Sequence, residues 1–113
     1  MSNAAATAVL KMTDQSFADT VKTNTLLVVD CYADWCGPCR MIAPIVEELA
    51  NHYSGRVAFA KVDVDNSPNI SRQFHISSIP TLLFFKNGEM VDRQVGALPK
   101  HALQARVDSL LAS

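Results

Sequence analysis

The feature that most constrains how this chain folds is an apolar run of seven residues, Leu26–Tyr32, which reads LLVVDCY. Its branched residues and near-continuous hydrophobicity are typical of a central strand covered on both faces. Apolar residues then recur at helical spacing through residues 41–49, with Glu47 and Glu48 on the outward side. A buried strand followed closely by an amphipathic helix predicts a layered α/β architecture.

The rest of the chain alternates between strand and helix patterns. Asn87-Gly88 is a two-residue hairpin signal between two strand patterns. The element order predicts a mixed sheet, parallel in its first half and antiparallel at the hairpin, with helices on both faces. Further strands are expected over residues 7–12, 56–62, 81–86 and 89–95. Three further helices are expected. The first follows Thr13, which is predicted to cap it, and the second runs from Ser67-Pro68 toward Phe74. The third carries the apolar residues Leu103, Val107, Leu110 and Leu111.

Composition limits the classes of function. With 113 residues, 49% hydrophobic and 19% charged, the chain can bury a core without disulfide staples. A formal net charge of -1 without a basic stripe argues against nucleic acid as a partner. No apolar run reaches the roughly 20 residues of a membrane span, and the N-terminus lacks the basic region of a secretory signal. We therefore expect a soluble, cytoplasmic protein. We also expect a monomer.

One domain is expected over residues 7–113, because no internal repeat, linker or low-complexity segment divides them. Residues 1–6 are expected to form a flexible N-terminus. Within them, Ser2-Asn3-Ala4 is consistent with residues left over from cloning, so these positions carry no weight in the argument.

Two cysteines three positions apart, Cys36 and Cys39 in ADWCGPCR, carry the most chemical information. A permanent disulfide is uncommon in a reducing cytosol, where a close pair is more often catalytic or metal-binding. A zinc site usually has about four ligands, and neither Cys31 nor the three histidines are spaced as its second half. Zinc stays open as the weaker alternative, and a redox-active dithiol is favoured.

The turn between strand and helix determines how the pair reacts. Cys36 comes just before the helix and Cys39 lies in its first turn, where Pro38 is well placed as an early helical residue. Free backbone N–H groups and the positive end of the helix dipole favour a thiolate at Cys36, and the thiolate is the nucleophile. Gly37 and Pro38 add no donor or charge between the cysteines, which favours a reductant over an oxidant.

An apolar strand that contains Asp is followed along the chain by the motifs WCGPC, RMIAP, IPTLLFFKNG and VGAL. In these motifs the chain is similar to the thioredoxin family, and the similarity extends from about Phe17 to the end of the chain. The resemblance implies the thioredoxin fold, an α/β fold with a central mixed five-stranded sheet flanked by four helices. It implies an enzyme that reduces protein disulfides and carries electrons, with thioredoxin reductase and disulfide-containing proteins as partners. The electrons are expected from NADPH through that reductase, with no metal or cofactor bound.

The resemblance also implies roles for individual residues. Cys36 is expected to attack the substrate disulfide and Cys39 to resolve the mixed disulfide, so that the two form the redox-active disulfide. Burial in the strand should raise the pKa of Asp30, which is expected to take the proton from Cys39 through water, with Lys61 as its partner lysine. The open alternative is that Asp30 is a structural carboxylate satisfied by Lys61.

A flat apolar contact surface around the disulfide is implied as well. The resemblance predicts a cis bond between Ile79 and Pro80 that presents the Ile79 backbone to an extended substrate segment, whereas sequence statistics favour trans. For Val64 and Val95, ordinary strand packing is an equal alternative. The surface consists of the active-site loop residues Trp35, Gly37 and Pro38 together with Val64, Ile79, Pro80, Val95, Gly96 and Ala97.

Two residues depart from the family pattern: Cys31 stands where an aromatic residue is usual, and Tyr32 where a tryptophan is frequent. On the alternation of a strand, Cys31 faces away from Asp30, which favours a buried packing role. A regulatory thiol open to oxidation is the alternative.

Two other classes of function remain open. An interaction module would use the same apolar rim without redox chemistry, so that replacing both cysteines by Ser would leave its function intact. An oxidase or isomerase would usually carry His or another donor between the cysteines, and Gly37-Pro38 argues against that class.

Overall fold

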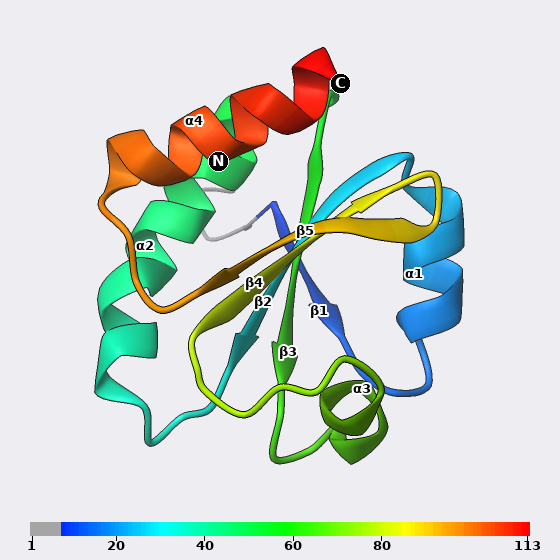
Figure 1. Ribbon diagram of the computed structural model, residues 1–113, viewed down its shortest axis with the longest axis vertical. Coiled ribbons are helices and arrows are strands. Elements are labelled where there is room, and N and C mark those ends of the chain that lie inside the picture. Colours follow the sequence, from blue (N-terminus) through cyan, green and yellow to red (C-terminus); the bar gives the residue numbers. More distant parts are fainter. Residues whose placement is uncertain (1–7) are drawn as a thin grey trace, which may run out of the picture.

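Strands and helices alternate along residues 8–113, the part of the chain that a computed structural model describes (Figure 1). The strands are β1 (Val9–Met12), β2 (Leu26–Tyr32), β3 (Ala58–Asp63), β4 (Thr81–Lys86) and β5 (Glu89–Val95). The helices are α1 (Phe17–Thr23), α2 (Gly37–His52), α3 (Pro68–Gln73) and α4 (Lys100–Ala112). The expected flexible segment 1–6, and Thr7 at the start of the predicted first strand, lie outside the described residues. Within residues 8–113, no helix is long and apolar enough to cross a membrane.

The five strands form one mixed sheet in the order β1-β3-β2-β4-β5. The apolar run predicted as a central strand is β2, which pairs with β3 in parallel and with β4 antiparallel. β1 lies parallel to β3 on one edge, and β5 lies antiparallel to β4 on the other. This confirms the predicted mixed sheet. The register places Asp30 opposite Lys61 of β3, near the end of β2 at which the helix α2 follows.

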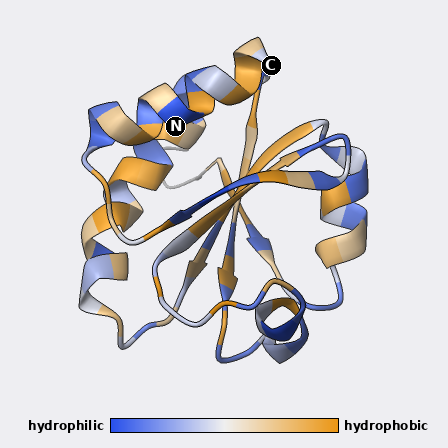
Figure 2. Ribbon diagram, viewed as in Figure 1, coloured by the Kyte–Doolittle hydropathy of each residue, from blue (hydrophilic) through white to orange (hydrophobic). Residues whose placement is uncertain are grey.

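Side chains that alternate along β2 divide the core into two layers. Val28 packs with α2 and α4, whereas Val29 and Cys31 pack with α1 and α3 on the opposite face. Figure 1 shows the two helix pairs on either side of the sheet, and Figure 2 shows hydrophobic residues concentrated in the central strands. Both faces of β2 are therefore buried, which explains why its sequence reads as a continuous apolar run.

The predicted hairpin joins β4 and β5 through Asn87 and Gly88. Both have positive φ, 53° and 85°, as a two-residue type I′ turn requires. A register shift between Phe84 and Phe85 adds one residue to the β5 side of the ladder. The hairpin prediction is confirmed, and the strand that leaves it leads directly to Gly96.

Two predicted boundaries are wrong for local reasons. Thr13 does not cap the first helix, because it exchanges hydrogen bonds with Ser16 in a turn that precedes α1: Thr13 N to Ser16 Oγ, 2.9 Å, and Ser16 N to Thr13 Oγ1, 3.3 Å. The second buried strand starts at Ala58 and not at residue 56. The N–H groups of Arg56 and Val57 donate to the carbonyl of Tyr53 in the turn after α2, and are not free to enter the sheet.

α3 begins after Ser67, as predicted, but Ser67 does not cap it. The buried Ser67 hydroxyl has no hydrogen-bond partner among the described residues. The cap comes instead from Asp14, whose carboxylate accepts from Asn69 N at 3.1 Å and from Ile70 N at 3.0 Å. A carboxylate 56 positions away therefore stabilises this short helix.

Candidate active site

Cys36 and Cys39 lie where β2 ends and α2 begins. Cys36 occupies the N-cap position of α2, and its Sγ accepts a hydrogen bond from Cys39 N at 3.2 Å. The two cysteines form a disulfide with a Cα–Cα distance of 5.3 Å, and both are buried. Pro38 lies in the first turn, where its missing N–H leaves no helical bond unmade. The strand-to-helix turn predicted from the sequence is confirmed, and the backbone N–H of Cys39 faces Cys36 Sγ at the positive end of the helix dipole.

The Ile79–Pro80 segment lies next to Cys36 of the disulfide. Its peptide bond is cis, as the family resemblance predicts. The carbonyl oxygen of Ile79 lies 3.8 Å from Cys36 Sγ. Gly96 N donates to the Pro80 carbonyl at 2.8 Å, and Thr81 Oγ1 donates to the Ser78 carbonyl at 2.6 Å. The start of β4 and the residue after β5 therefore hold Ile79 next to the disulfide.

The residues predicted to form the contact surface fall into two groups. Tyr32, Val64 and Ile79 pack against the buried cluster of Ala33 and the two cysteines, so Val64 has a packing role. Trp35 and Val95 are exposed, at 69% and 52%, which disfavours strand packing as the explanation for Val95. Gly37 and Gly96 are half-buried, Pro38 and Ala97 are exposed, and Pro80 is buried.

Two polar contacts of the active-site loop escaped the sequence analysis. Trp35 Nε1 donates to Asp65 Oδ2 at 2.8 Å, which ties the exposed indole to the turn after β3. Arg40 Nη1 donates to the carbonyl of Asp34 at 2.6 Å, which links the start of α2 back to the loop. Neither hydrogen bond can be predicted from residue types and their spacing, because both depend on where the backbone turns.

Asp30 lies next to Cys39 and is only 5% exposed. Its Oδ1 has no hydrogen-bond partner among the described residues. Burial raises the pKa of Asp30 from 3.8 to about 7, and the positive charge of Lys61 offsets part of that increase. A cavity of about 160 Å³ opens beside the carboxylate. It is lined by Asp30, Tyr32, Ala33, Asp34, Cys39, Arg40, Ala43 and Lys61.

Lys61 does not form a close ion pair with Asp30. The ion pairs within residues 8–113 join Lys100 to Glu48 and Arg106 to Asp92. The Lys61 ammonium lies 5.9 Å from the centre of the Tyr32 ring and acts on Asp30 only through its charge. The alternative in which Lys61 satisfies a purely structural Asp30 therefore lacks the contact it needs.

Cys31 faces away from Asp30 and is fully buried among apolar side chains of β2, β3, β4 and α3. Burial raises the pKa of its thiol to about 12; the Asp30 charge adds to the increase, and Arg93 offsets part of it. A thiol that is buried and protonated is a poor nucleophile. The predicted orientation is confirmed, and this burial favours the packing role over the regulatory one.

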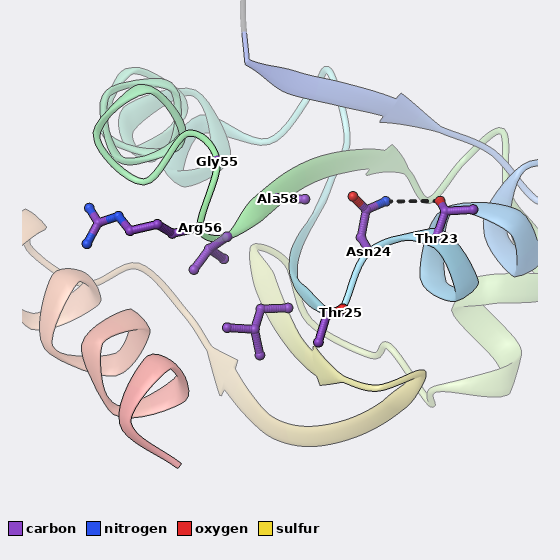
Figure 3. A pocket seen from close by; sticks show the side chains of 8 residues that line it. Thr23, Asn24, Thr25, Gly55, Arg56 and Ala58 are labelled. Carbon is purple, nitrogen blue, oxygen red and sulfur yellow. Dashed lines mark hydrogen bonds between the residues drawn. The ribbon is translucent and has the colours of Figure 1, made fainter.

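A larger hollow, of about 300 Å³, lies at the other end of the sheet (Figure 3). The residues that line it lie at the starts of β2 and β3, whereas the cysteines follow the end of β2. Asn24 Nδ2 donates to the Thr20 carbonyl and to Thr23 Oγ1, and Arg56 extends away from Asn24 to donate to the His52 carbonyl. The side chains of Asn24 and Arg56 thus form hydrogen bonds within their own local turns and do not form a reactive cluster. Within residues 8–113, no three His, Cys, Asp or Glu side chains gather in a way that could hold a metal ion, so zinc has no donor set there.

Comparison with known proteins decides the family. The family model described as Thioredoxin matches residues 8–109. The chain belongs to the thioredoxin family. It is 46% identical to the thioredoxin of Staphylococcus saprophyticus over 92% of this chain and 99% of that protein. It is 48% identical to the thioredoxin of Acidithiobacillus ferridurans over 92% of this chain and 97% of that protein.

A chloroplast protein is among the similar sequences as well. The M-type chloroplastic thioredoxin of Pisum sativum is 48% identical over 80% of this chain and 53% of that protein. Family membership, the five-stranded mixed sheet and the cysteine pair at disulfide distance make this chain a disulfide oxidoreductase that works by thiol–disulfide exchange. The thioredoxin fold predicted from the resemblance is confirmed.

Proposed function

We propose that this chain reduces disulfides in proteins and carries two electrons per cycle. The observation that supports it most is the Cys36–Cys39 disulfide at the start of α2, with the Ile79 carbonyl near Cys36 and the buried Asp30 lining one cavity with Cys39. In the reduced protein, the Cys36 thiolate attacks one sulfur of a substrate disulfide. A mixed disulfide forms, and the other substrate sulfur leaves as a thiolate.

Cys39 completes the exchange. Its thiol gives a proton to the Asp30 carboxylate, and the resulting thiolate attacks Cys36 Sγ. The second substrate sulfur leaves, and the Cys36–Cys39 disulfide closes, so two electrons have passed to the substrate. A pKa of about 7 supports Asp30 in this role, because near neutral pH the carboxyl can both accept and release a proton. The cavity lined by Asp30 and Cys39 gives room for water between them.

The remaining parts of the proposal concern Lys61, the substrate surface and the partners. Lys61 is proposed to tune Asp30 through its charge. Substrate is proposed to bind as an extended segment along the Ile79 backbone, within the surface formed by Trp35, Gly37, Pro38, Val64, Ile79, Pro80, Val95, Gly96 and Ala97. Thioredoxin reductase is proposed to return two electrons from NADPH to the disulfide, without a cofactor bound to this chain.

We also propose a cytoplasmic monomer in which residues 7–113 form one domain. The pea relative is by its name a chloroplast protein, so the compartment needs a direct test. Fractionation of the native host and a sedimentation measurement address compartment and assembly.

The test of the central proposal is NADPH oxidation with thioredoxin reductase and insulin as the disulfide substrate. We expect steady turnover for the wild type and background rates for Cys36→Ser. Cys39→Ser should instead accumulate a mixed disulfide with the substrate. Cys31→Ala is the matched control, since its thiol lies away from the site, and it should turn over like the wild type. Equal rates for the wild type and Cys36→Ser would overturn the proposal and favour an interaction module.

A further inference from the structure

Residues 74–80 connect α3 to β4 and carry Ile79 to the disulfide. No helix or strand includes them, and Ser77 and Ser78 are exposed. His75 adopts a positive φ of 53°, which marks a sharp turn directly after α3. A segment with exposed backbone and few ladder bonds takes several positions unless other groups hold it. The position of Ile79 therefore depends on what holds this segment at each end.

Arg93 of β5 holds the end next to α3. Its guanidinium donates through Nη2 to the carbonyl of Phe74, and Nη1 lies 3.5 Å from the carbonyl of His75. Carbonyls beyond the last turn of a helix lack helical partners, and an arginine fork can reach two of them at once. The Arg93 side chain is half-buried, so water competes less for these carbonyls than at a free surface.

The other end of the segment is held by the start of β4 and by the residue after β5. Thr81 Oγ1 donates to the Ser78 carbonyl, and Gly96 N donates to the Pro80 carbonyl. Arg93 and Gly96 are three residues apart, so one short stretch of chain contacts the segment at both ends. Within residues 8–113, two side chains donate hydrogen bonds to carbonyls of this segment: Thr81, which directly follows it, and Arg93. Arg93 is therefore the donor that comes from a different part of the chain.

We propose that Arg93 is a positioning residue for substrate binding: it clamps the Phe74–His75 turn to β5 and thereby sets where the Ile79 backbone stands beside Cys36. Its side-chain hydrogen bonds go to Phe74 and His75 and not to Cys36 or Cys39, so it acts through Ile79. The inference rests on the proposed function, in which the Ile79 backbone pairs with an extended segment of the substrate.

The clamp has a distinct kinetic signature. If the segment holds its binding position for only a fraction of the time, the apparent dissociation constant rises by the reciprocal of that fraction. The chemistry at Cys36 and Cys39, and hence kcat, is unchanged once the substrate is bound. A small aromatic disulfide that needs no backbone pairing should not sense the difference.

Three variants separate the possibilities. Arg93→Met keeps the length of the side chain but removes its donors, and Arg93→Lys keeps the charge with a single donor group. Arg106→Met is the matched control: Arg106 of α4 donates to Asp92 Oδ2, Gln94 Oε1 and the Arg93 carbonyl, so it contacts β5 without reaching residues 74–80. Each variant is assayed with NADPH, excess thioredoxin reductase and either insulin or the small aromatic disulfide.

For Arg93→Met we expect the KM for insulin to rise about five- to tenfold, which is the net scale of one ordinary hydrogen bond, with kcat within about twofold of the wild type. Rates with the small disulfide should change less than about twofold under the same argument. Arg93→Lys should recover part of the lost affinity, and Arg106→Met should keep the wild-type KM.

One structural readout accompanies the kinetics. Arg93→Met should speed hydrogen exchange of the Gly96 amide, which bonds to the Pro80 carbonyl. A lower thermal midpoint with an unchanged KM for insulin would overturn the positioning role. Failure of the wild type to reduce insulin would instead refute the proposed function, so the two failures are distinguishable.

Discussion

Replacing Asp30 by Ala should make the oxidised protein more stable at neutral and alkaline pH while slowing its catalysis. The folded protein buries this carboxyl, leaves Oδ1 without a partner among the described residues, and raises its pKa to about 7 from 3.8. Above pH 3.8 the unfolded chain releases the proton readily, whereas the folded protein holds it until about pH 7. Ionisation therefore favours unfolding, and this destabilisation begins near pH 4 and is complete above pH 7.

The magnitude follows from the two pKa values. They differ by about 3, and each tenfold change in an acidity constant corresponds to about 1.4 kcal/mol, so the carboxylate destabilises the fold by roughly 4 kcal/mol at pH 9. Removing the carboxyl group also removes some packing, which offsets roughly 1 kcal/mol. The net gain for Asp30→Ala should be about 3 kcal/mol at pH 9, and it should vanish or turn into a small loss below pH 4.

Urea unfolding of the oxidised wild type and of Asp30→Ala between pH 3 and pH 9 measures this difference. Asp63→Ala is a control that changes a carboxylate at the end of the neighbouring strand, where Asp63 accepts from Asp65 N and Asn66 Nδ2. It should show no stabilisation at alkaline pH. A free energy of unfolding for Asp30→Ala that is below the wild-type value at pH 9, or a difference that does not depend on pH, would show that the buried carboxylate does not destabilise the fold. Insulin reduction by the same variant should slow by about tenfold or more.

Three further predictions concern the supports of the site. Cys31 in the native oxidised protein should resist iodoacetamide at pH 7 and react only on unfolding, as followed by mass spectrometry; rapid labelling would contradict its packing role. Asp14→Ala should lower the free energy of unfolding by about 1 kcal/mol in urea titration, because Asn69 N and Ile70 N lose their cap, whereas Asp14→Asn should keep most of it. Gly96→Ala should destabilise by about 1 kcal/mol, since φ is 92° there; an unchanged thermal midpoint would show that the backbone relaxes freely.

Features that depend on neighbouring residues could be predicted from the sequence alone. Periodicity placed the central strand at Leu26–Tyr32, the hairpin at Asn87 and Gly88, and the cysteines at the start of a helix. These features are local because side-chain alternation, turn conformation and helix capping each depend on a few adjacent residues. Local reasoning also produced the error at Thr13, where a turn with Ser16 competes with the cap.

The assembly of the site depends on contacts between segments that are distant in the sequence and meet only in the folded protein. The Ile79 carbonyl reaches Cys36 across 43 positions, and Asp14 caps α3 across more than 50. The pKa of Asp30 depends on the two sheet neighbours and the helix layer that remove water from it, and no pattern within β2 states how complete that removal is. The same holds for the contact of Arg93 with Phe74, because hydrogen bonds between distant segments exist only once strand order and register are set.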